Sequence, residues 1–199
     1  MHQMKKTTKS FMAIIGISMV AILISATPAK TTFTVSKNYT VSIHGTSNLH
    51  DWDEKVGTVT GEGNVKWNAD GSFDLTAINI KMDVHSIKSD MGSVMDNNTY
   101  KALKASSNPE IIFKLESPVN NIPKASEKIV SALGNLSIAG VTRAVNMQVK
   151  VYMQPSGTLT FEGSQTVKTT DYGVDPPTAL FGTLKTGKEI KINFKINLQ

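Results

Sequence analysis

Residues 190 to 198 read IKINFKINL, and this stretch decides the fold class. Apolar side chains occupy every second position, and lysine or asparagine fills the positions between them. Successive side chains of a β-strand point to opposite faces of its sheet, so the alternation predicts a strand with one buried face and one face in water. We therefore expect an all-β protein.

The same alternation recurs through most of the chain from residue 39 onward. Its longest run is Val145–Met153, and the sequence NADG (68–71) supplies a strong turn signal between two shorter runs. Between Leu75 and Ile78 the apolar register slips by one residue, which predicts a β-bulge. Many short strands separated by turn signals predict an antiparallel barrel or sandwich.

One segment, DNNTYKALKA (96–105), departs from this pattern. Asp96 or Asn97 could cap a helix, and Tyr100 and Leu103 are three residues apart, on one helical face. The segment predicts one short helix.

The N-terminus has the features of a secretory signal peptide. The first ten residues carry three lysines and no acid, residues 11–24 are almost wholly apolar, and small residues follow at 25–29. The apolar run is shorter than the roughly 20 residues that a spanning helix needs. We predict a signal peptide over residues 1–29, cleaved after Ala26 or Ala29, and a periplasmic or secreted protein. The alternative is an uncleaved anchor.

Charge and cysteine content exclude several functions. Removal of the predicted signal peptide leaves about 170 residues, the size of one domain, with 18 basic against 16 acidic side chains. Arg143 is the one arginine, and the lysines are scattered, so nucleic acid is not an expected partner. The sequence has no cysteine, which excludes thiol catalysis, disulfide exchange and cysteine metal sites.

A membrane barrel is the less favoured alternative to a soluble one. Several predicted strands are shorter than the roughly 9–11 residues needed to cross a bilayer. The aromatic residues after the signal peptide are few and form no girdles. We expect no integral membrane span after signal cleavage, and a homodimer remains possible.

No catalytic motif stands out. The sequence contains neither G-x-S-x-G nor H-E-x-x-H, so we expect no catalytic residue and no metal ligand. The stretch GTSNLHDWD (45–53) places His50 beside Asp51, but neighbours on a strand point to opposite faces. We interpret it as a turn at the barrel end, where His50 and Trp52 could meet the polar head of a ligand. A hydrolase that uses His50 as its base is the less favoured interpretation.

The segment GNLSIAGVTRAVNMQVKV (134–151) resembles the G-x-L-T-I-x-G-V-T-R-x-V strand pair of the YceI-like family, which comprises periplasmic, polyisoprenoid-binding, lipocalin-like proteins. YKALKASSNPEIIFKL (100–115) and the segment that begins TTDYGVDPP (169–198) resemble two further parts of the family pattern. Thr169 and the sequence MDNN (95–98) replace charged residues of that pattern.

The resemblance implies an antiparallel eight-stranded lipocalin-like β-barrel with one short helix, over residues 38–199. It also implies a non-enzymatic protein that binds, carries or sequesters a long apolar lipid, such as a polyisoprenoid or an isoprenoid quinone, in its cavity. No other cofactor is expected. A ligand-free structural or stress-related interaction module remains the principal alternative.

Alternation identifies candidate lining residues, because their polar neighbours would be costly to bury. The expected ligand-binding residues are Val145, Met147, Val149, Val151, Ile192, Phe194, Ile196, Met82, Phe113, His50, Trp52 and Tyr100. Burial of one CH₂ contributes about 0.8 kcal/mol at best, and drug-sized ligands average about 0.3 kcal/mol per heavy atom. One isoprene unit then contributes about 1.5 to 4 kcal/mol, so a few units suffice with little polar recognition.

Overall fold

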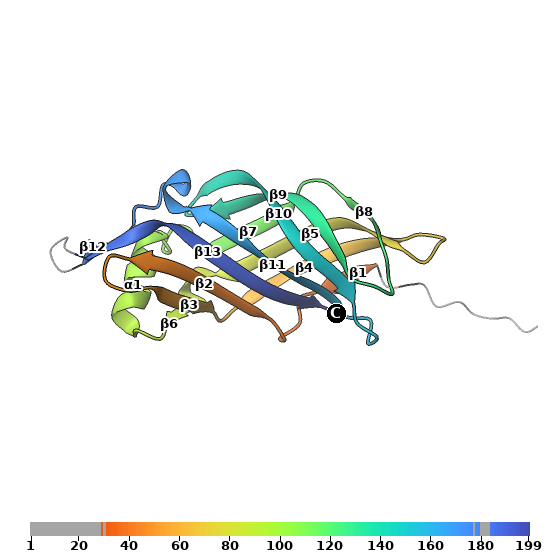
Figure 1. Ribbon diagram of the computed structural model, residues 1–199, viewed down its shortest axis with the longest axis horizontal. Coiled ribbons are helices and arrows are strands. Elements are labelled where there is room, and N and C mark those ends of the chain that lie inside the picture. Colours follow the sequence, from red (N-terminus) through yellow and green to blue (C-terminus); the bar gives the residue numbers. More distant parts are fainter. Residues whose placement is uncertain (1–28, 30, 177, 180–183) are drawn as a thin grey trace, which may run out of the picture.

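The computed structural model describes residues 29, 31–176, 178–179 and 184–199, and more than half of them belong to one curled antiparallel sheet (Figure 1). Its strands are β1 (Thr32–Thr34), β2 (Thr40–Ser47), β3 (Trp52–Val56), β4 (Val59–Trp67), β5 (Phe73–Asp83), β6 (Ile87–Ser89), β7 (Glu110–Leu115), β8 (Val119–Ile122), β9 (Lys128–Ile138), β10 (Val141–Met153), β11 (Leu159–Lys168), β12 (Thr178–Ala179) and β13 (Leu184–Leu198). The helices are η1 (Val84–Ser86), α1 (Ser93–Ala102) and η2 (Thr169–Tyr172).

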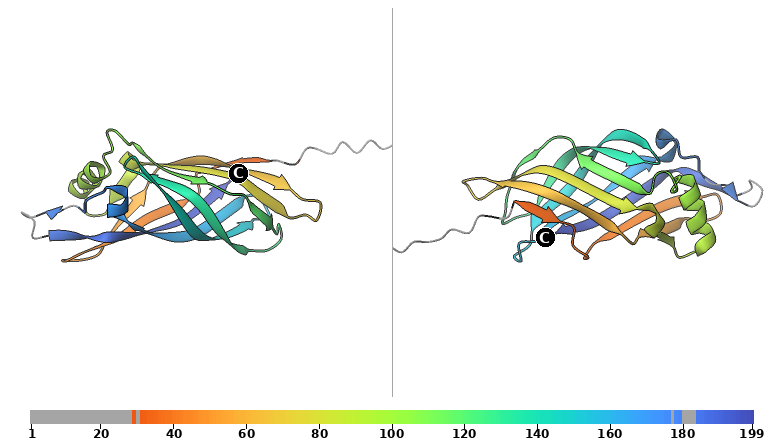
Figure 2. Two further views of the ribbon diagram at one scale, coloured as in Figure 1. Left: turned by 90° about the horizontal axis from the view of Figure 1, so that it is seen from above. Right: turned by 180° about the vertical axis from the view of Figure 1, so that it is seen from behind.

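The sheet curls into a half-barrel with the strand order β1-β4-β5-β7-β9-β10-β11-β13-β2-β3-β6. At one end β1 brings the two sides together, because Thr34 and Gln199 exchange two backbone hydrogen bonds of 2.8 Å (Figure 2). The prediction of an all-β, barrel-like fold with one α-helix is confirmed. The strand number differs from the expected eight: the described residues form thirteen strands, because the short β1, β6, β8 and β12 add to the longer ones.

The hairpin of β9 and β10 shows how local sequence fixes the register. The two strands pair without interruption from Val141 with Ile138 to Val151 with Lys128. Only Ala139 and Gly140 connect them, at φ values of 49° and 84°. A two-residue turn whose backbone has positive φ at both positions matches the twist of the flanking strands.

The predicted bulge is confirmed in β5. Asn64 pairs with Ala77 and Val65 pairs with Leu75, which leaves Thr76 as the extra residue. The shift returns the apolar side chains on both sides of Thr76 to the barrel interior, where Leu75 and Ile78 are buried.

The helix begins earlier than expected. It starts at Ser93 after Gly92, and no side chain caps it, so the predicted start at residue 96 is wrong. Asp96 is buried in the first turn and accepts a 2.8 Å hydrogen bond from the backbone N–H of Ser89. Its second oxygen lies 3.1 Å from Nζ of Lys88. The carboxylate of Asp96, which the local sequence predicted as a helix cap, therefore bonds to β6 instead.

The helix α1 lies at one end of the barrel, beside β3 and β6, and the β4–β5 and β10–β11 turns lie at the other (Figures 1 and 2). Apolar side chains from nearly every strand form one core inside the sheet. No helix in the described part of the chain is long and apolar enough to cross a membrane. The predicted signal peptide falls outside the described residues, except for Ala29.

Candidate ligand-binding site

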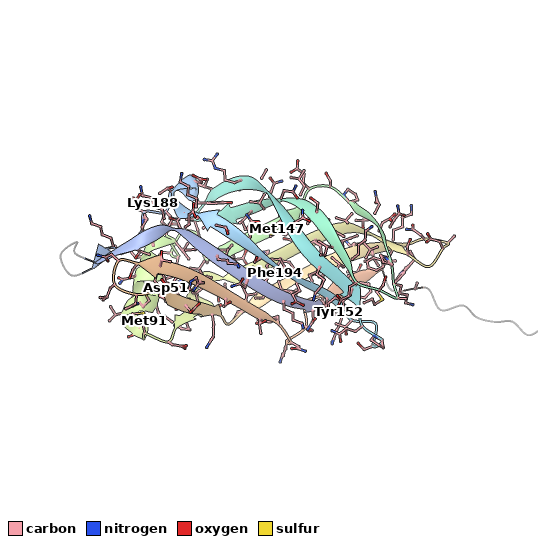
Figure 3. The ribbon with its side chains drawn as sticks, viewed as in Figure 1. Asp51, Met91, Met147, Tyr152, Lys188 and Phe194 are labelled. Carbon is pink, nitrogen blue, oxygen red and sulfur yellow. The ribbon has the colours of Figure 1, made fainter. Side chains whose placement is uncertain are left out.

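The middle of the barrel contains an apolar cavity of about 90 Å³. Its walls come from β5, β7, β9, β10, β11 and β13, and Gln165 is the polar residue among them. Eight of the expected ligand-binding residues line this cavity: Met82, Phe113, Met147, Val149, Val151, Ile192, Phe194 and Ile196. Figure 3 shows Met147 and Phe194 near the middle of the barrel, whereas Lys188 lies toward the end that carries α1.

Two phenylalanine rings of this cavity lie against glycines of neighbouring strands. A Cβ on Gly134 would lie 2.4 Å from Cζ of Phe113, and one on Gly163 would lie 3.0 Å from Cζ of Phe194. Both separations are shorter than an ordinary van der Waals contact of 3.4–4 Å, and the one at Gly134 is much shorter. The glycines thus let the rings fold back onto the sheet, and this arrangement leaves space along the barrel axis.

A second cavity of about 80 Å³ lies at the α1 end. Side chains from β2, β3, α1 and β13 surround it, together with Val174 and Pro176 from the segment after η2. Ile192 lines both cavities, so they are neighbours along the barrel and share one wall. They follow one another from the barrel centre toward the helix, with Ile192 between them.

The second cavity differs from the first because it contains a buried acid. Glu54 is 1% exposed, and Thr99 Oγ1 donates a 2.5 Å hydrogen bond to its Oε1. Burial raises the pKa of Glu54; the hydrogen bond from Thr99 opposes this shift, and the nearby charge of Asp96 adds to it. In contrast, the backbone N–H of Ser89 and the ammonium of Lys88 lower the pKa of Asp96. The pKa values of these two neighbouring carboxyls are therefore shifted in opposite directions.

Besides Ile192, which lines both cavities, Trp52 is the expected residue that lines the second cavity. Its indole N–H donates a 3.2 Å hydrogen bond to the backbone oxygen of Thr46, so its polar atom is already used. The ring lies against Gly45, its partner across the β2–β3 ladder. The indole consequently offers the cavity an apolar surface.

Three expected residues line neither cavity. His50 is exposed in the β2–β3 turn, where its Nδ1 lies 3.0 Å from the backbone oxygen of Asp51. The hydroxyl of Tyr100 is held at β6, 2.8 Å from the backbone oxygen of Ile87 and 2.6 Å from Nζ of Lys88. Val145 shares a strand face with Met147 but lines a surface groove at the end of β10.

That groove lies where β10 and β11 separate. The two strands pair from Val149 with Gly163 to Met153 with Leu159. Within the described residues, residues 141–148 of β10 do not pair with residues 164–168 of β11, and the groove occupies the gap between these two segments. Gln165 lines both the groove and the first cavity, so the gap adjoins the barrel interior.

Sequence reasoning missed Glu54, Thr99 and Leu103, which all line the second cavity. A signal for Glu54 was present, because Trp52, Glu54 and Val56 alternate along β3 and therefore share one face. An acid between two apolar residues of the same face is a candidate for burial. For Thr99, only the packing of α1 over the barrel end provides the explanation.

No metal site emerges from the described residues, since no group of three or more potential ligands comes together there. On the outer face of β2, His44 lies near two carboxylates. Its Nδ1 lies 3.1 Å from Oδ1 of Asp53, and its Nε2 lies 4.0 Å from Oδ2 of Asp51.

Comparison with known proteins gives one family and a consistent fold. The model of the YceI-like domain matches residues 24–198. No protein of curated description matches the sequence. Among solved structures, a polyisoprenoid binding domain from Saccharophagus degradans implicated in plant cell wall breakdown is 11% identical, with a TM-score of 0.68 over 85% of this chain and 99% of that one.

Two further structures have the same fold. Burkholderia cenocepacia BcnA is 20% identical, with a TM-score of 0.59 over 82% of this chain and 98% of that one. The Campylobacter jejuni YCEI protein is 14% identical, with a TM-score of 0.52 over 96% of this chain and 97% of that one.

Proposed function

The chain belongs to the YceI-like family, and from this premise we propose that it binds a long apolar lipid, of the polyisoprenoid or isoprenoid-quinone kind, inside its barrel. The protein carries or sequesters this lipid in the periplasm or outside the cell, as its basic and apolar N-terminal sequence suggests. The description of the Saccharophagus domain as polyisoprenoid binding supports the ligand class.

One observation carries the proposal: two apolar cavities lie in line and share Ile192. A single rounded cavity would favour a compact ligand, whereas a path along the barrel fits a chain. Because the lining is apolar, each isoprene unit adds about 1.5 to 4 kcal/mol of binding free energy.

The chain must widen this path when it binds. The cavities enclose about 90 and 80 Å³, and an apolar cavity of about 150 Å³ holds a molecule as small as benzene. Met82 and Met147 line the first cavity, and methionine adapts its shape readily because its side chain is unbranched. We infer that these side chains and Ile192 move aside as the lipid enters.

Binding without catalysis is the function that these groups support. Glu54 is the acid of the second cavity, and no histidine lines either space. His50 lies in an exposed turn, away from both cavities, which offers no support for a hydrolase built on it.

Native mass spectrometry of the protein purified gently from its own cells tests the proposal, followed by solvent extraction of the bound material. A stoichiometric isoprenoid is the expected result. A protein that is consistently empty, and that also fails to take up the fluorescent apolar probe N-phenyl-1-naphthylamine, would instead support a ligand-free interaction module.

A further inference from the structure

Glu54 lies at a position where a carboxyl group is energetically unfavourable. Its side chain is 1% exposed and lines the second cavity together with Ile43, Trp52, Met95 and Leu103. Burial of an ionised carboxylate among apolar groups costs several kcal/mol unless a partner compensates it.

The hydrogen bonding of Glu54 is incomplete. Oε1 accepts the hydrogen bond from Thr99, but no described residue forms a hydrogen bond or an ion pair with Oε2. A buried polar group normally has a partner, and a group without one inside a cavity is available to a ligand. Glu54 is thus a polar anchor in a wall whose other described residues carry no charge.

The surroundings favour the protonated form of this anchor. The charge of Asp96 on α1 acts on Glu54 and opposes a second negative charge. Lys88 on β6 already pairs with Asp96 at 3.1 Å, and Lys185 and Lys188 are exposed and do not line the cavity. Burial acts in the same direction and raises the pKa of Glu54. In its protonated form the group has an O–H to donate.

We propose that Glu54 donates a hydrogen bond to an uncharged oxygen at the head of the bound lipid, while the lipid chain runs past Ile192 into the first cavity. This inference rests on the proposed lipid-binding function and adds the ligand class to it. Ketones, quinones and alcohols fit the site because their oxygen accepts a hydrogen bond. Isoprenoid phosphates do not, because no cation among the described residues lines the cavity to pair with their charge.

Three probes test this class: geranylgeranylacetone, geranylgeranyl phosphate and the hydrocarbon 2,6,10,14-tetramethylnonadecane, which has the same carbon skeleton as the ketone. Their affinities are measured by competition with N-phenyl-1-naphthylamine. We expect the ketone to bind about fivefold more tightly than the hydrocarbon, which is the net contribution of one hydrogen bond. The phosphate should bind more weakly than the ketone. As pH rises through the pKa of Glu54, the preference for the ketone should disappear.

Two variants separate the donor from the shape of the side chain. Glu54→Leu removes the donor and should erase the preference for the ketone while hydrocarbon binding persists. Glu54→Gln keeps an N–H donor and cannot titrate, so it should retain the preference at all pH values. Asp53→Asn, the adjacent exposed carboxylate on the outer face, is the matched control and should change nothing.

The outcomes distinguish this inference from the proposed function. A phosphate that binds as tightly as the ketone, or a Glu54→Leu protein that keeps the ketone preference, would overturn the role of Glu54 but leave lipid binding intact. A wild-type protein that binds none of the three probes would overturn lipid binding itself. If Glu54→Leu fails to fold, the pH series on the wild-type protein still tests the role of Glu54, because a ketone preference that does not change with pH would overturn it.

Discussion

The indole of Trp52 lies against Gly45, its partner across the β2–β3 ladder, so closely that a Cβ at residue 45 would lie 2.1 Å from Cζ2 of the ring. The glycine therefore determines where the indole can lie. Because Trp52 lines the second cavity, the absence of a side chain at residue 45 shapes one wall of the candidate site.

Gly45→Ala should displace the Trp52 ring and lower the free energy of unfolding by about 1–3 kcal/mol, the usual cost of overpacking. Urea denaturation measures the loss, and tryptophan fluorescence reports the movement of the ring. Thr46→Ala at the next, exposed position is the control and should change stability by less than about 0.5 kcal/mol, because Trp52 bonds to the backbone oxygen of Thr46. Equal stabilities of the two variants would show that the ring accommodates a methyl group.

Ile192→Trp should block the junction of the two cavities. A bound chain that loses one isoprene unit of contact loses about tenfold or more in affinity, which competition with N-phenyl-1-naphthylamine can measure. Lys191→Trp adds the same bulk to the adjacent exposed position and should leave affinity unchanged. A folded Ile192→Trp protein that binds geranylgeranylacetone normally would mean that the chain does not pass Ile192.

Glu54→Gln should change how stability depends on pH. Burial raises the folded-state pKa of Glu54 above its unfolded-state value. The wild-type protein is therefore favoured below the ordinary glutamate pKa, and it loses this advantage as pH rises through the raised value. Relative to Glu54→Gln, its free energy of unfolding should fall over that range and then level off. Urea denaturation at a series of pH values measures the difference, and a flat difference would show that Glu54 titrates normally.

Asp96→Asn should give the opposite slope. The backbone N–H of Ser89, together with Lys88, lowers the folded-state pKa of Asp96, so its contribution is present above the ordinary aspartate pKa and is lost as pH falls through the lowered value. The same pH series should show the wild-type protein gaining stability over Asp96→Asn as pH rises. If both variants slope in the same direction, the assignment of the two carboxyls is incorrect.

Ala139→Gly should stabilise the protein by up to about 1 kcal/mol. Ala139 has a φ of 49°, a conformation that costs an alanine more than a glycine. Thermal unfolding measures the change. Ala144→Gly in the exposed, extended part of β10 is the control, and it should destabilise the protein because glycine weakens a strand. Loss of stability in Ala139→Gly would show that the methyl group of the buried Ala139 contributes more by packing than its backbone costs.

The barrel class and the Thr76 bulge could be predicted because period-two alternation records directly which side of a sheet is buried. The residues of the long strands that line the first cavity could be predicted from the same alternation. Val145 shows the limit of this rule. It lies on the same face of β10 as Met147, but β10 separates from β11 at that point. An alternating sequence does not show where two paired strands separate.

The polar residues of the site depend on tertiary packing. Asp96 has the character of a helix cap in its local sequence, yet the backbone of Ser89 uses its carboxylate. Glu54 has an ordinary place in an alternating strand, and it becomes buried only because α1 packs over it and brings Thr99 into contact. Local pattern cannot predict which end of the barrel a helix will cover.

The gap between β10 and β11 also determines how the barrel responds mechanically. A closed cylinder resists radial expansion with every hydrogen bond around its circumference, whereas a cylinder with a slit widens by bending. Along residues 141–148 and 164–168 of the described chain, no ladder hydrogen bond opposes such bending, so side-chain contacts alone resist it there. The barrel wall therefore bends more easily there than where the two strands pair, beside Gln165, where the wall of the first cavity adjoins the slit.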